Sequence, residues 1–241
     1  MSDGVVIIPT YNEIENIESI VRAIFSLHKP FDILVVDDNS PDKTAAKVSE
    51  LQKEFNARLF LEIRTKKSGL GTAYVHGFKW ALSRAYQYIF EMDADFSHNP
   101  QDLEKLYNAC HFESGDLAIG SRYVTGVNVV NWPLSRVLMS YFASVYVKMI
   151  TGMKIHDATA GFICYKRNVL ESINLDQIKF IGYAFQIEMK YRAFSRNFKI
   201  VEVPIIFTDR TKGESKMSNL IIKEAVFGVI SLKIRKIFNR L

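Results

Sequence analysis

Short, continuous apolar runs alternate along this chain with longer segments whose apolar residues recur every three or four positions. The apolar runs are bounded by turn residues, and we expect them to be buried strands. They lie at residues 5–9, 33–36, 59–63, 88–92, 117–119, 162–165 and 200–203. The segments with helical spacing predict helices at residues 14–24, 44–55, 72–86, 101–109, 136–151, 183–195 and 220–238.

A capping signal precedes the first helix. Asn12 can accept hydrogen bonds from the free N–H groups of a helix start, and Glu15 follows three residues later, as in a capping box. We therefore expect Asn12 to be the N-cap of this helix.

Strands that alternate with helices indicate an α/β fold. Right-handed crossovers then give a mostly parallel sheet with helices on both faces. Ligands of such sheets bind beyond the carboxyl ends of the strands. Polar residues cluster after three of the predicted strands, at residues 10–13, 37–40 and 93–95. We expect the functional site at this edge of the sheet.

The third cluster, Asp93-Ala94-Asp95, carries the most specific chemistry. Two carboxylates one residue apart, directly after a buried strand, suit a divalent cation on a diphosphate, because Mg²⁺ and Mn²⁺ prefer oxygen ligands. Mg²⁺ is typically held by one or two carboxylates together with the phosphates of the substrate. The pattern indicates a nucleotide-diphosphate site, although the same spacing also occurs in solvated loops.

The composition is globular, with 241 residues of which 48% are hydrophobic and 24% charged. Charge is uneven: residues 1–120 carry 12 Lys and Arg against 18 Asp and Glu, and residues 121–241 carry 19 against 8. A cationic half is typical of proteins that face phosphorylated substrates, anionic lipid or nucleic acid. No nucleic-acid-binding module is recognisable, so nucleic acid is not an expected partner.

Cys110 and Cys164 lack paired spacing and predict neither a disulfide framework nor a zinc site.

The ends of the sequence bear on location. The N-terminus lacks the regions of a secretory signal, and no uncharged apolar stretch approaches the roughly 20 residues that cross a bilayer. Residues 219–241 mix apolar residues with lysines and arginines, as in a helix that lies in a membrane interface. A core-packed helix with a solvated basic end is the alternative. We expect a catalytic domain over residues 1–218, a basic amphipathic membrane-surface helix over residues 219–241, and a peripheral protein on the cytoplasmic side of a membrane.

Four segments carry a resemblance to a known family. They are residues 5–13 (VVIIPTYNE), 35–40 (VVDDNS), 69–73 (GLGTA) and 92–95 (MDAD), and their order and spacing resemble the family 2 inverting glycosyltransferases, which have a GT-A fold. Further segments look like those of dolichyl-phosphate and polyprenyl-phosphate mannose synthases: residues 96–100, 120–123, 182–189, 202–204 and 213–216. The resemblance covers nearly the whole chain.

The resemblance implies how the nucleotide sugar is held. Five residues would bind the nucleotide, with an aromatic ring on the base and a carboxylate on the base or ribose: Pro9, Tyr11, Glu13, Val36 and Asp38. A simple turn role is the alternative for Asp38. Asp93 and Ala94 would also contact the donor.

By the same resemblance, Asp95 and Ser97 match the positions that bind Mg²⁺ or Mn²⁺. Relatives carry Gln where this chain has Ser97, and a neutral hydroxyl is a weak metal ligand, so Ser97 could act through water. We expect Asp95 to be the main protein ligand.

The basic half would supply the phosphate-binding groups. Five residues match positions that gather the donor pyrophosphate and the acceptor phosphate: Arg122, Arg136, Ser140, Arg210 and Lys216. Guanidinium groups suit this role because they bind phosphate oxygens bidentately. Arg136 and Ser140 stand four apart on one face of an otherwise apolar helix, where an unpaired charge costs several kcal/mol. With Asp95 and Arg122, they are the expected catalytic residues.

Three other features fall in the same region. Gly69 and Gly71 could bring backbone to a phosphate, but the third glycine of a dinucleotide-binding motif is absent, and a tight turn with a helix cap is the alternative. We expect His98 to fix the loop after the metal site. The resemblance implies that Asp157 shapes the acceptor side.

The resemblance implies inverting transfer of mannose from GDP-mannose to dolichyl or polyprenyl phosphate. The acceptor is anionic at neutral pH, since the second pKa of a phosphate monoester is about 6. No general base is then required. Two alternatives stay open: glucose transfer from UDP-glucose to polyprenyl phosphate, and a catalytically silent nucleotide-sugar-binding subunit at a membrane surface. A small membrane-anchoring subunit could recruit the chain.

Overall fold

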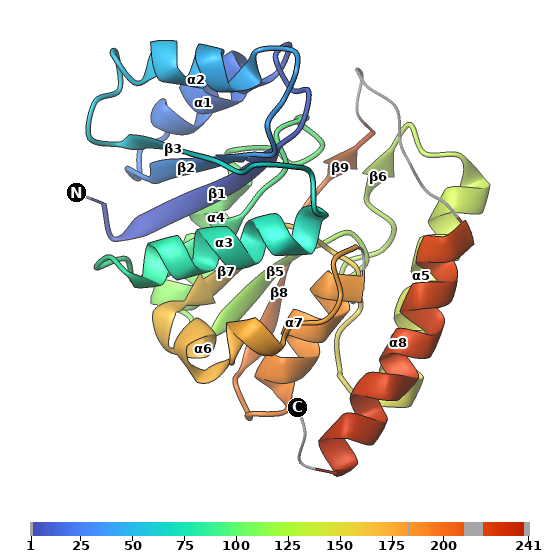
Figure 1. Cartoon of the computed structure of the whole chain (residues 1–241). Coiled ribbons are helices and arrows are strands. Elements are labelled where there is room, and N and C mark those ends of the chain that lie inside the picture. The colour runs from blue at the N-terminus through green and yellow to red at the C-terminus, as the bar shows by residue number, and fades with distance from the viewer. Residues whose placement is uncertain (1, 183, 210–218, 239–241) are drawn as a thin grey trace.

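A seven-stranded sheet forms the centre of the molecule (Figure 1). The computed structural model describes residues 2–182, 184–209 and 219–238, with side chains in the last segment from residue 227 onward. The strand order is β3-β2-β1-β4-β7-β5-β8, and β7 alone among them runs antiparallel to its neighbours. The strands are β1 (Gly4–Thr10), β2 (Asp32–Asp37), β3 (Leu59–Ile63), β4 (Tyr88–Glu91), β5 (Leu117–Ser121), β7 (Ile163–Lys166) and β8 (Ile200–Pro204). The predicted α/β fold with a mostly parallel sheet is confirmed.

Helices cover both faces of the sheet. They are α1 (Ile17–Phe25), α2 (Thr44–Leu51), α3 (Leu70–Leu82), α4 (Asp102–His111), α5 (Leu134–Thr151), α6 (Arg167–Ser172), α7 (Ala184–Phe194) and α8 (Asn219–Ile237). The buried residues of α1, α2 and α4 pack on one face, and those of α3, α6 and α7 pack on the other. Val5 and Ile7 of β1 belong to the second layer, while Val6 and Ile8 belong to the first. Alternate side chains of this central strand are therefore buried on opposite faces.

The start of α1 differs from the prediction. Asn12 is not its N-cap, because the helix begins at Ile17 and Asn12 has a left-handed φ of 62°. The N–H of Asn12 donates to Ser40 Oγ at 3.0 Å, and the N–H of Glu13 donates to Thr44 Oγ1 at 3.0 Å. The capping-box prediction is wrong because this loop is bound to the loop that follows β2.

Several short elements were not predicted. They are α6, a 3₁₀ turn (η1, Leu175–Gln177), and a two-stranded parallel pair of β6 (Val129–Val130) and β9 (Phe207–Thr208). The predicted helices are present, with ends that shift by a few residues. Strands of two residues carry too little periodicity to be recognised from sequence.

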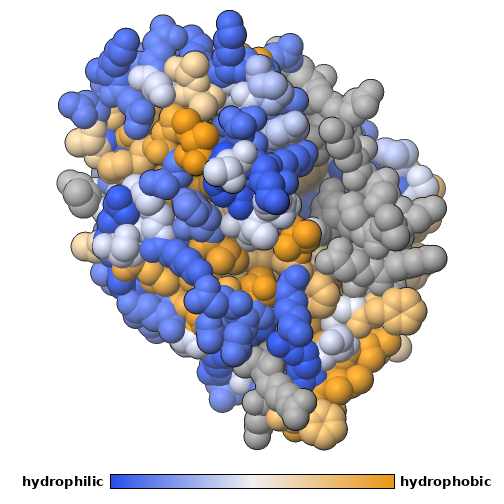
Figure 2. All heavy atoms as spheres, in the orientation of Figure 1, coloured by the Kyte–Doolittle hydropathy of each residue, from blue (hydrophilic) through white to orange (hydrophobic). Residues whose placement is uncertain are grey.

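Helices α5 and α8 lie side by side at one edge of the molecule (Figure 1). Val229 and Leu232 of α8 are buried in the core, so part of this helix packs as the alternative reading proposed. Other apolar side chains of the pair stay exposed: Leu134, Leu138, Met139, Tyr141, Phe142, Val145, Met149, Phe227, Ile230, Ile234 and Ile237. Figure 2 shows apolar side chains gathered over α8. Among the described helices, none combines the length and hydropathy of a membrane span.

Candidate active site

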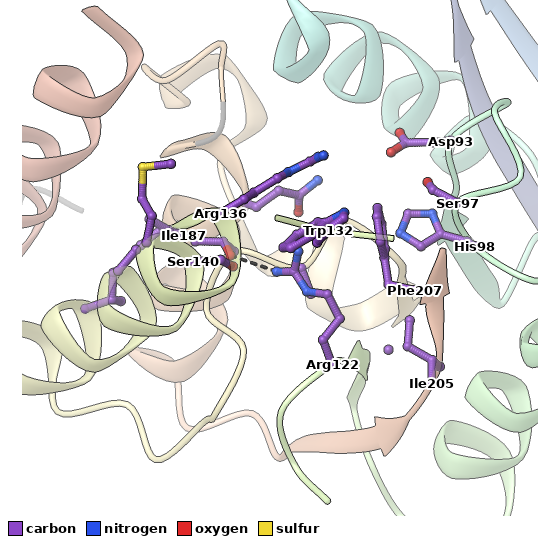
Figure 3. A pocket seen from close by; sticks show the side chains of 18 of the residues that line it. Asp93, Ser97, His98, Arg122, Trp132, Arg136, Ser140, Ile187, Ile205 and Phe207 are labelled. Atoms are coloured by element: carbon purple, nitrogen blue, oxygen red, sulfur yellow. Dashed lines mark hydrogen bonds between the residues drawn. The ribbon is translucent and has the colours of Figure 1, made fainter. Parts of the chain in front are cut away.

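A cavity of about 460 Å³ lies beyond the carboxyl ends of β4 and β5 (Figure 3). Its wall comes from the loop after β4, from α5, from the loop before β7 and from α7. Six of the predicted site residues line it together: Asp93, Asp95, Ser97, Arg122, Arg136 and Ser140. The structure therefore brings the predicted cation-binding and phosphate-binding groups into one enclosure.

Oxygen atoms form the acidic end of the cavity. The Tyr74 hydroxyl lies 3.4 Å from Asp93 Oδ1, and the N–H of Ser97 donates to Asp95 Oδ1 at 3.0 Å. Ser97 Oγ is buried and has no hydrogen-bond partner among the described residues. A carboxylate beside an uncommitted hydroxyl oxygen fits a hard divalent cation. In the described part of the chain, no three His, Cys, Asp or Glu side chains gather as a metal-binding group.

Arg122 enters the cavity from the end of β5 and is held by Asp157. Its Nε and Nη2 donate to the Asp157 carboxylate at 2.7 and 2.6 Å, and Nη2 also donates to Thr159 Oγ1 at 2.9 Å. Burial acts to raise the pKa of Asp157, but the charge and hydrogen bonds of Arg122 lower the pKa below its ordinary value. Asp157 therefore holds Arg122 in place, and its expected acceptor-side role stays a prediction.

An aromatic row connects the acidic end with the second arginine (Figure 3). The rings of His98 and Phe207 lie 5.3 Å apart, and those of Phe207 and Trp132 lie 5.2 Å apart. The guanidinium of Arg136 covers Trp132 at 4.1 Å, and that of Arg122 lies 5.3 Å from the same ring. Both guanidinium groups therefore lie within cation–π range of the same indole ring.

Arg136 has partners that the sequence did not reveal. Its Nη1 donates to Asp209 Oδ1 at 2.8 Å, and its side chain is only partly buried. The premise of an unpaired charge among apolar residues is therefore wrong. Ser140 follows one turn later on the same cavity-lining face of α5. Arg210 and Lys216 lie outside the described residues.

The five predicted nucleotide residues lie at the ends of β1 and β2, beyond the lining of the cavity. Pro9 pairs with Val36 across the two strands, and the Val36 side chain is fully buried. Both oxygens of Asp38 accept from Arg64, at 2.5 and 2.7 Å. The predicted contact of Asp38 with the base or ribose therefore stays a prediction.

Tyr11 and Glu13 are partly buried in the loop after β1. Lys67 Nζ lies 4.1 Å from the centre of the Tyr11 ring. Glu13 accepts from the side-chain amide of Asn16 at 2.9 Å, and Ala94 is buried in the core. A nucleotide could reach the backbone edges of both strands here, as the resemblance implies.

The two glycines before α3 have a structural role. Gly69 occupies the N-cap with a φ of 98°, a conformation that L side chains rarely adopt. A Cβ on Gly71 would lie 2.8 Å from the carbonyl oxygen of Phe180 and from the Phe185 ring. These contacts support the turn-and-cap alternative.

His98 is a packed, neutral side chain. Its ring stacks on Phe162 at 4.8 Å with an interplanar angle of 16°. Burial lowers the pKa of His98 to about 4, so the imidazole is uncharged at neutral pH. This environment fits the predicted role of fixing the loop after the metal site.

A buried polar network behind the cavity was not predicted. Glu91 accepts from the Tyr165 hydroxyl at 2.9 Å and from Gln186 Nε2. Lys190 Nζ donates to the carbonyl oxygens of Ala158 and Ala160, at 3.2 and 2.6 Å. Burial raises the pKa of Glu91 to about 7 and lowers that of Lys190 to about 8. The one available sequence signal was Glu91 itself, a charged residue inside an apolar run.

Known proteins resemble this chain in sequence. The polyprenol monophosphomannose synthase of Mycolicibacterium smegmatis is 48% identical over 95% of this chain and 86% of its own length. The undecaprenyl-phosphate mannosyltransferase of Micrococcus luteus is 44% identical over 92% of this chain and 90% of its own length. The dolichol-phosphate mannosyltransferase of Pyrococcus furiosus is 39% identical over 91% of this chain, which spans 60% of that protein.

Solved structures share the fold. The UDP complex of glucosyl-3-phosphoglycerate synthase from Mycobacterium tuberculosis superposes with a TM-score of 0.68 over 97% of this chain and 79% of that one, at 15% identity. Staphylococcus aureus TarS gives 0.66 over 99% and 66%, at 18% identity. The sequence model named Glycosyl transferase family 2 matches residues 5–173. The chain therefore belongs to glycosyl transferase family 2.

Proposed function

We propose that this chain transfers mannose from GDP-mannose to dolichyl or polyprenyl phosphate, with inversion at the anomeric carbon. One observation carries the proposal: a single cavity holds an acidic oxygen cluster, two arginines and an apolar wall formed by α5. A sugar diphosphate, a second phosphate and a hydrocarbon chain are the ligands that such a lining recognises. The names of the three relatives, all mannosyl-transferring enzymes for polyprenol-type acceptors, agree with it.

The donor lies across the carboxyl ends of β1, β2 and β4. Tyr11 faces the base, and Val36 contributes through its backbone, because its side chain is buried in the core. The remaining donor contacts come from Pro9, Glu13, Asp38, Asp93 and Ala94. Asp95 and Ser97 would hold Mg²⁺ or Mn²⁺, which when bound would neutralise charge on the departing diphosphate. Solved structures with this fold contain Mn²⁺ together with UDP.

Arg122, Arg136 and Ser140 orient the acceptor phosphate, with Arg210 and Lys216 as further anion-binding groups. An acceptor phosphate oxygen forms the new bond to the anomeric carbon as the bond from that carbon to the diphosphate oxygen breaks, and GDP leaves. The phosphate oxygen carries no proton to remove, so positioning and charge stabilisation provide the catalysis. The aromatic row of His98, Phe207 and Trp132 lines this path.

The exposed apolar faces of α5 and α8 support a location of the active site at a lipid surface. Met139 and Phe142 belong both to the cavity wall and to the exposed face of α5, so the acceptor chain leaves the cavity along this helix. Lys233, Arg235 and Lys236 of α8 add attraction to anionic headgroups. The chain is thus a catalytic domain over residues 1–218 with a membrane-surface helix over residues 219–241. It acts from the cytoplasmic side as a peripheral protein, and a small anchoring subunit could strengthen the attachment.

Purified chain, labelled GDP-mannose or UDP-glucose, and a polyprenyl phosphate test the function. We expect label from GDP-mannose in the organic phase, dependent on the polyprenyl phosphate and on Mg²⁺ or Mn²⁺. Label from UDP-glucose would establish the glucosyl alternative. Nucleotide-sugar binding without any lipid product would establish the silent subunit.

A further inference from the structure

Gln186 brings a buried acceptor atom without a partner among the described residues to the wall of the cavity. Its side chain is 3% exposed, and its carboxamide oxygen Oε1 has no hydrogen-bond partner among the described residues. Gln186 is among the residues that line the cavity. A buried carbonyl oxygen without a donor costs free energy, so a ligand that supplies one gains affinity there.

The buried network fixes the orientation of this amide. Gln186 Nε2 donates to one oxygen of Glu91, and the Tyr165 hydroxyl donates to the other at 2.9 Å. Above its pKa of about 7, the carboxylate of Glu91 is ionised, so it accepts hydrogen bonds and cannot donate. If the amide were turned over, two acceptor oxygens would face each other. The carbonyl oxygen of Gln186 is therefore the atom left for a ligand.

Gln186 lies where the transferred sugar would bind, and not at the site of either phosphate. Glu91 ends β4 and Asp93 follows it by two residues, and the two carboxylates are close enough to interact electrostatically. Gln186 thus lies beside the acidic end, in a cavity whose other polar wall is Arg122 and Arg136. A group that links the donor diphosphate to the acceptor phosphate during transfer must lie between these walls. That group is the sugar, and its hydroxyls are hydrogen-bond donors.

We infer that Gln186 is a specificity-determining residue, whose carboxamide oxygen accepts a hydrogen bond from one hydroxyl of the transferred sugar. The inference rests on the proposed function, because it takes the sugar to be delivered by a nucleotide diphosphate at this cavity. Glu91 is the positioning residue that holds the amide in register. The site then distinguishes sugars by the orientation or presence of that hydroxyl, since an analogue without it leaves a buried acceptor unpaired.

The test compares wild type with Gln186→Leu on GDP-mannose and on its analogues that each lack one hydroxyl. Above the pKa of Glu91, at about pH 8, we expect wild type to lose roughly tenfold in kcat/KM on one of these analogues. For Gln186→Leu, we expect kcat/KM on GDP-mannose to fall by a similar factor. Its kcat/KM on GDP-mannose and on that analogue should then agree within about twofold. Gln87→Leu, which changes an exposed amide, keeps the wild-type ratio.

Gln186→Met is the second variant, because an unbranched side chain of similar length fits where leucine does not. Equal treatment of the two donors by either folded variant supports the inference. If both folded variants discriminate between the donors as wild type does, the inference is overturned. Failure of wild type to transfer mannose at all would instead reject the proposed function, and the two failures are therefore distinct.

Discussion

Asp157 clamps Arg122 at two points inside the protein, with Nε and Nη2 donating at 2.7 and 2.6 Å. The same carboxylate accepts from the backbone N–H of Arg122 at 3.0 Å. Both ends of the arginine are therefore fixed before any substrate enters. The Arg122 guanidinium is therefore preorganised, and its side chain does not have to move when an anionic substrate binds.

Asp157→Asn breaks this clamp. We expect a loss of about 3–5 kcal/mol in the free energy of unfolding, because the charge of Arg122 stays buried without its partner. We also expect kcat/KM to fall roughly a hundredfold through misplacement of the guanidinium. Denaturant unfolding and steady-state kinetics measure the two effects. Asp176→Asn, whose ion pair with Lys79 is 77% exposed at the aspartate, is the control and should change little.

Asp95→Ala removes the main proposed metal ligand. Transfer should be lost at all concentrations of Mg²⁺ or Mn²⁺, with little change in thermal stability, because Asp95 is only partly buried. Ser97→Ala should cost less, since a hydroxyl is a weaker ligand than a carboxylate. Metal titrations of the initial rate provide the measurement. Wild-type turnover by Asp95→Ala at saturating metal would refute this role.

Arg136→Ala should weaken the acceptor end of the site. We expect the KM for polyprenyl phosphate to rise roughly tenfold or more, and the KM for GDP-mannose to change less, since Arg136 lines the cavity from α5 and the acidic residues line it from the loop after β4. Arg136→Lys should recover part of the loss by restoring charge without the planar fork. A larger effect on the donor than on the acceptor would contradict this division.

The exposed apolar face predicts binding to lipid. Met149 and Ile237 are 77% and 66% exposed on α5 and α8, and neither lines the cavity. A Met149→Ser, Ile237→Ser double variant should sediment less with anionic liposomes, and added salt should weaken binding of both proteins. Phe112→Ser, equally exposed but after α4, serves as the control. Equal sedimentation of all three proteins would argue against this face.

Glu91 gives stability a pH dependence. Its pKa rises from 4.5 to about 7 in the folded protein, mainly through burial. Between these values the folded state binds more protons than the unfolded state, so the free energy of unfolding falls as pH rises. The slope approaches about 1.4 kcal/mol per pH unit. Urea titrations between about pH 5 and 7 give the free energy of unfolding of wild type and of Glu91→Gln. The difference between the two values at each pH should isolate this slope. A flat difference would show that Glu91 is ionised throughout.

The sequence predicted the fold well because its signals are local and repeated. Seven apolar runs correspond to seven strands, and the polar residues after β1, β2 and β4 lie at one edge of the sheet. Alternating strands and helices leave few ways to arrange such a chain. The grouping of Asp95, Ser97, Arg122, Arg136 and Ser140 came from the resemblance, and the cavity agrees with it.

Long-range pairings were the part that could not be predicted. Gln186 meets Glu91 across 95 positions, and Asp157 meets Arg122 across 35. Helix α7 is buried on every side from Ala184 to Ala193, so its polar residues show no amphipathic pattern that would assign their partners. The failed capping box at Asn12 has the same origin, because the competing acceptor belongs to a loop 28 residues away.

The reversed strand β7 has a consequence for biosynthesis. Tyr88 of β4 pairs with Lys166, and Leu117 of β5 pairs with Ile200, so the sheet stays open until the distal part of the polypeptide has left the ribosome. Strands β1 to β3 can associate much earlier, since their partners are close in sequence. A nascent chain that pauses before β7 would then expose an incomplete sheet with unpaired strand edges, which chaperones must protect from aggregation.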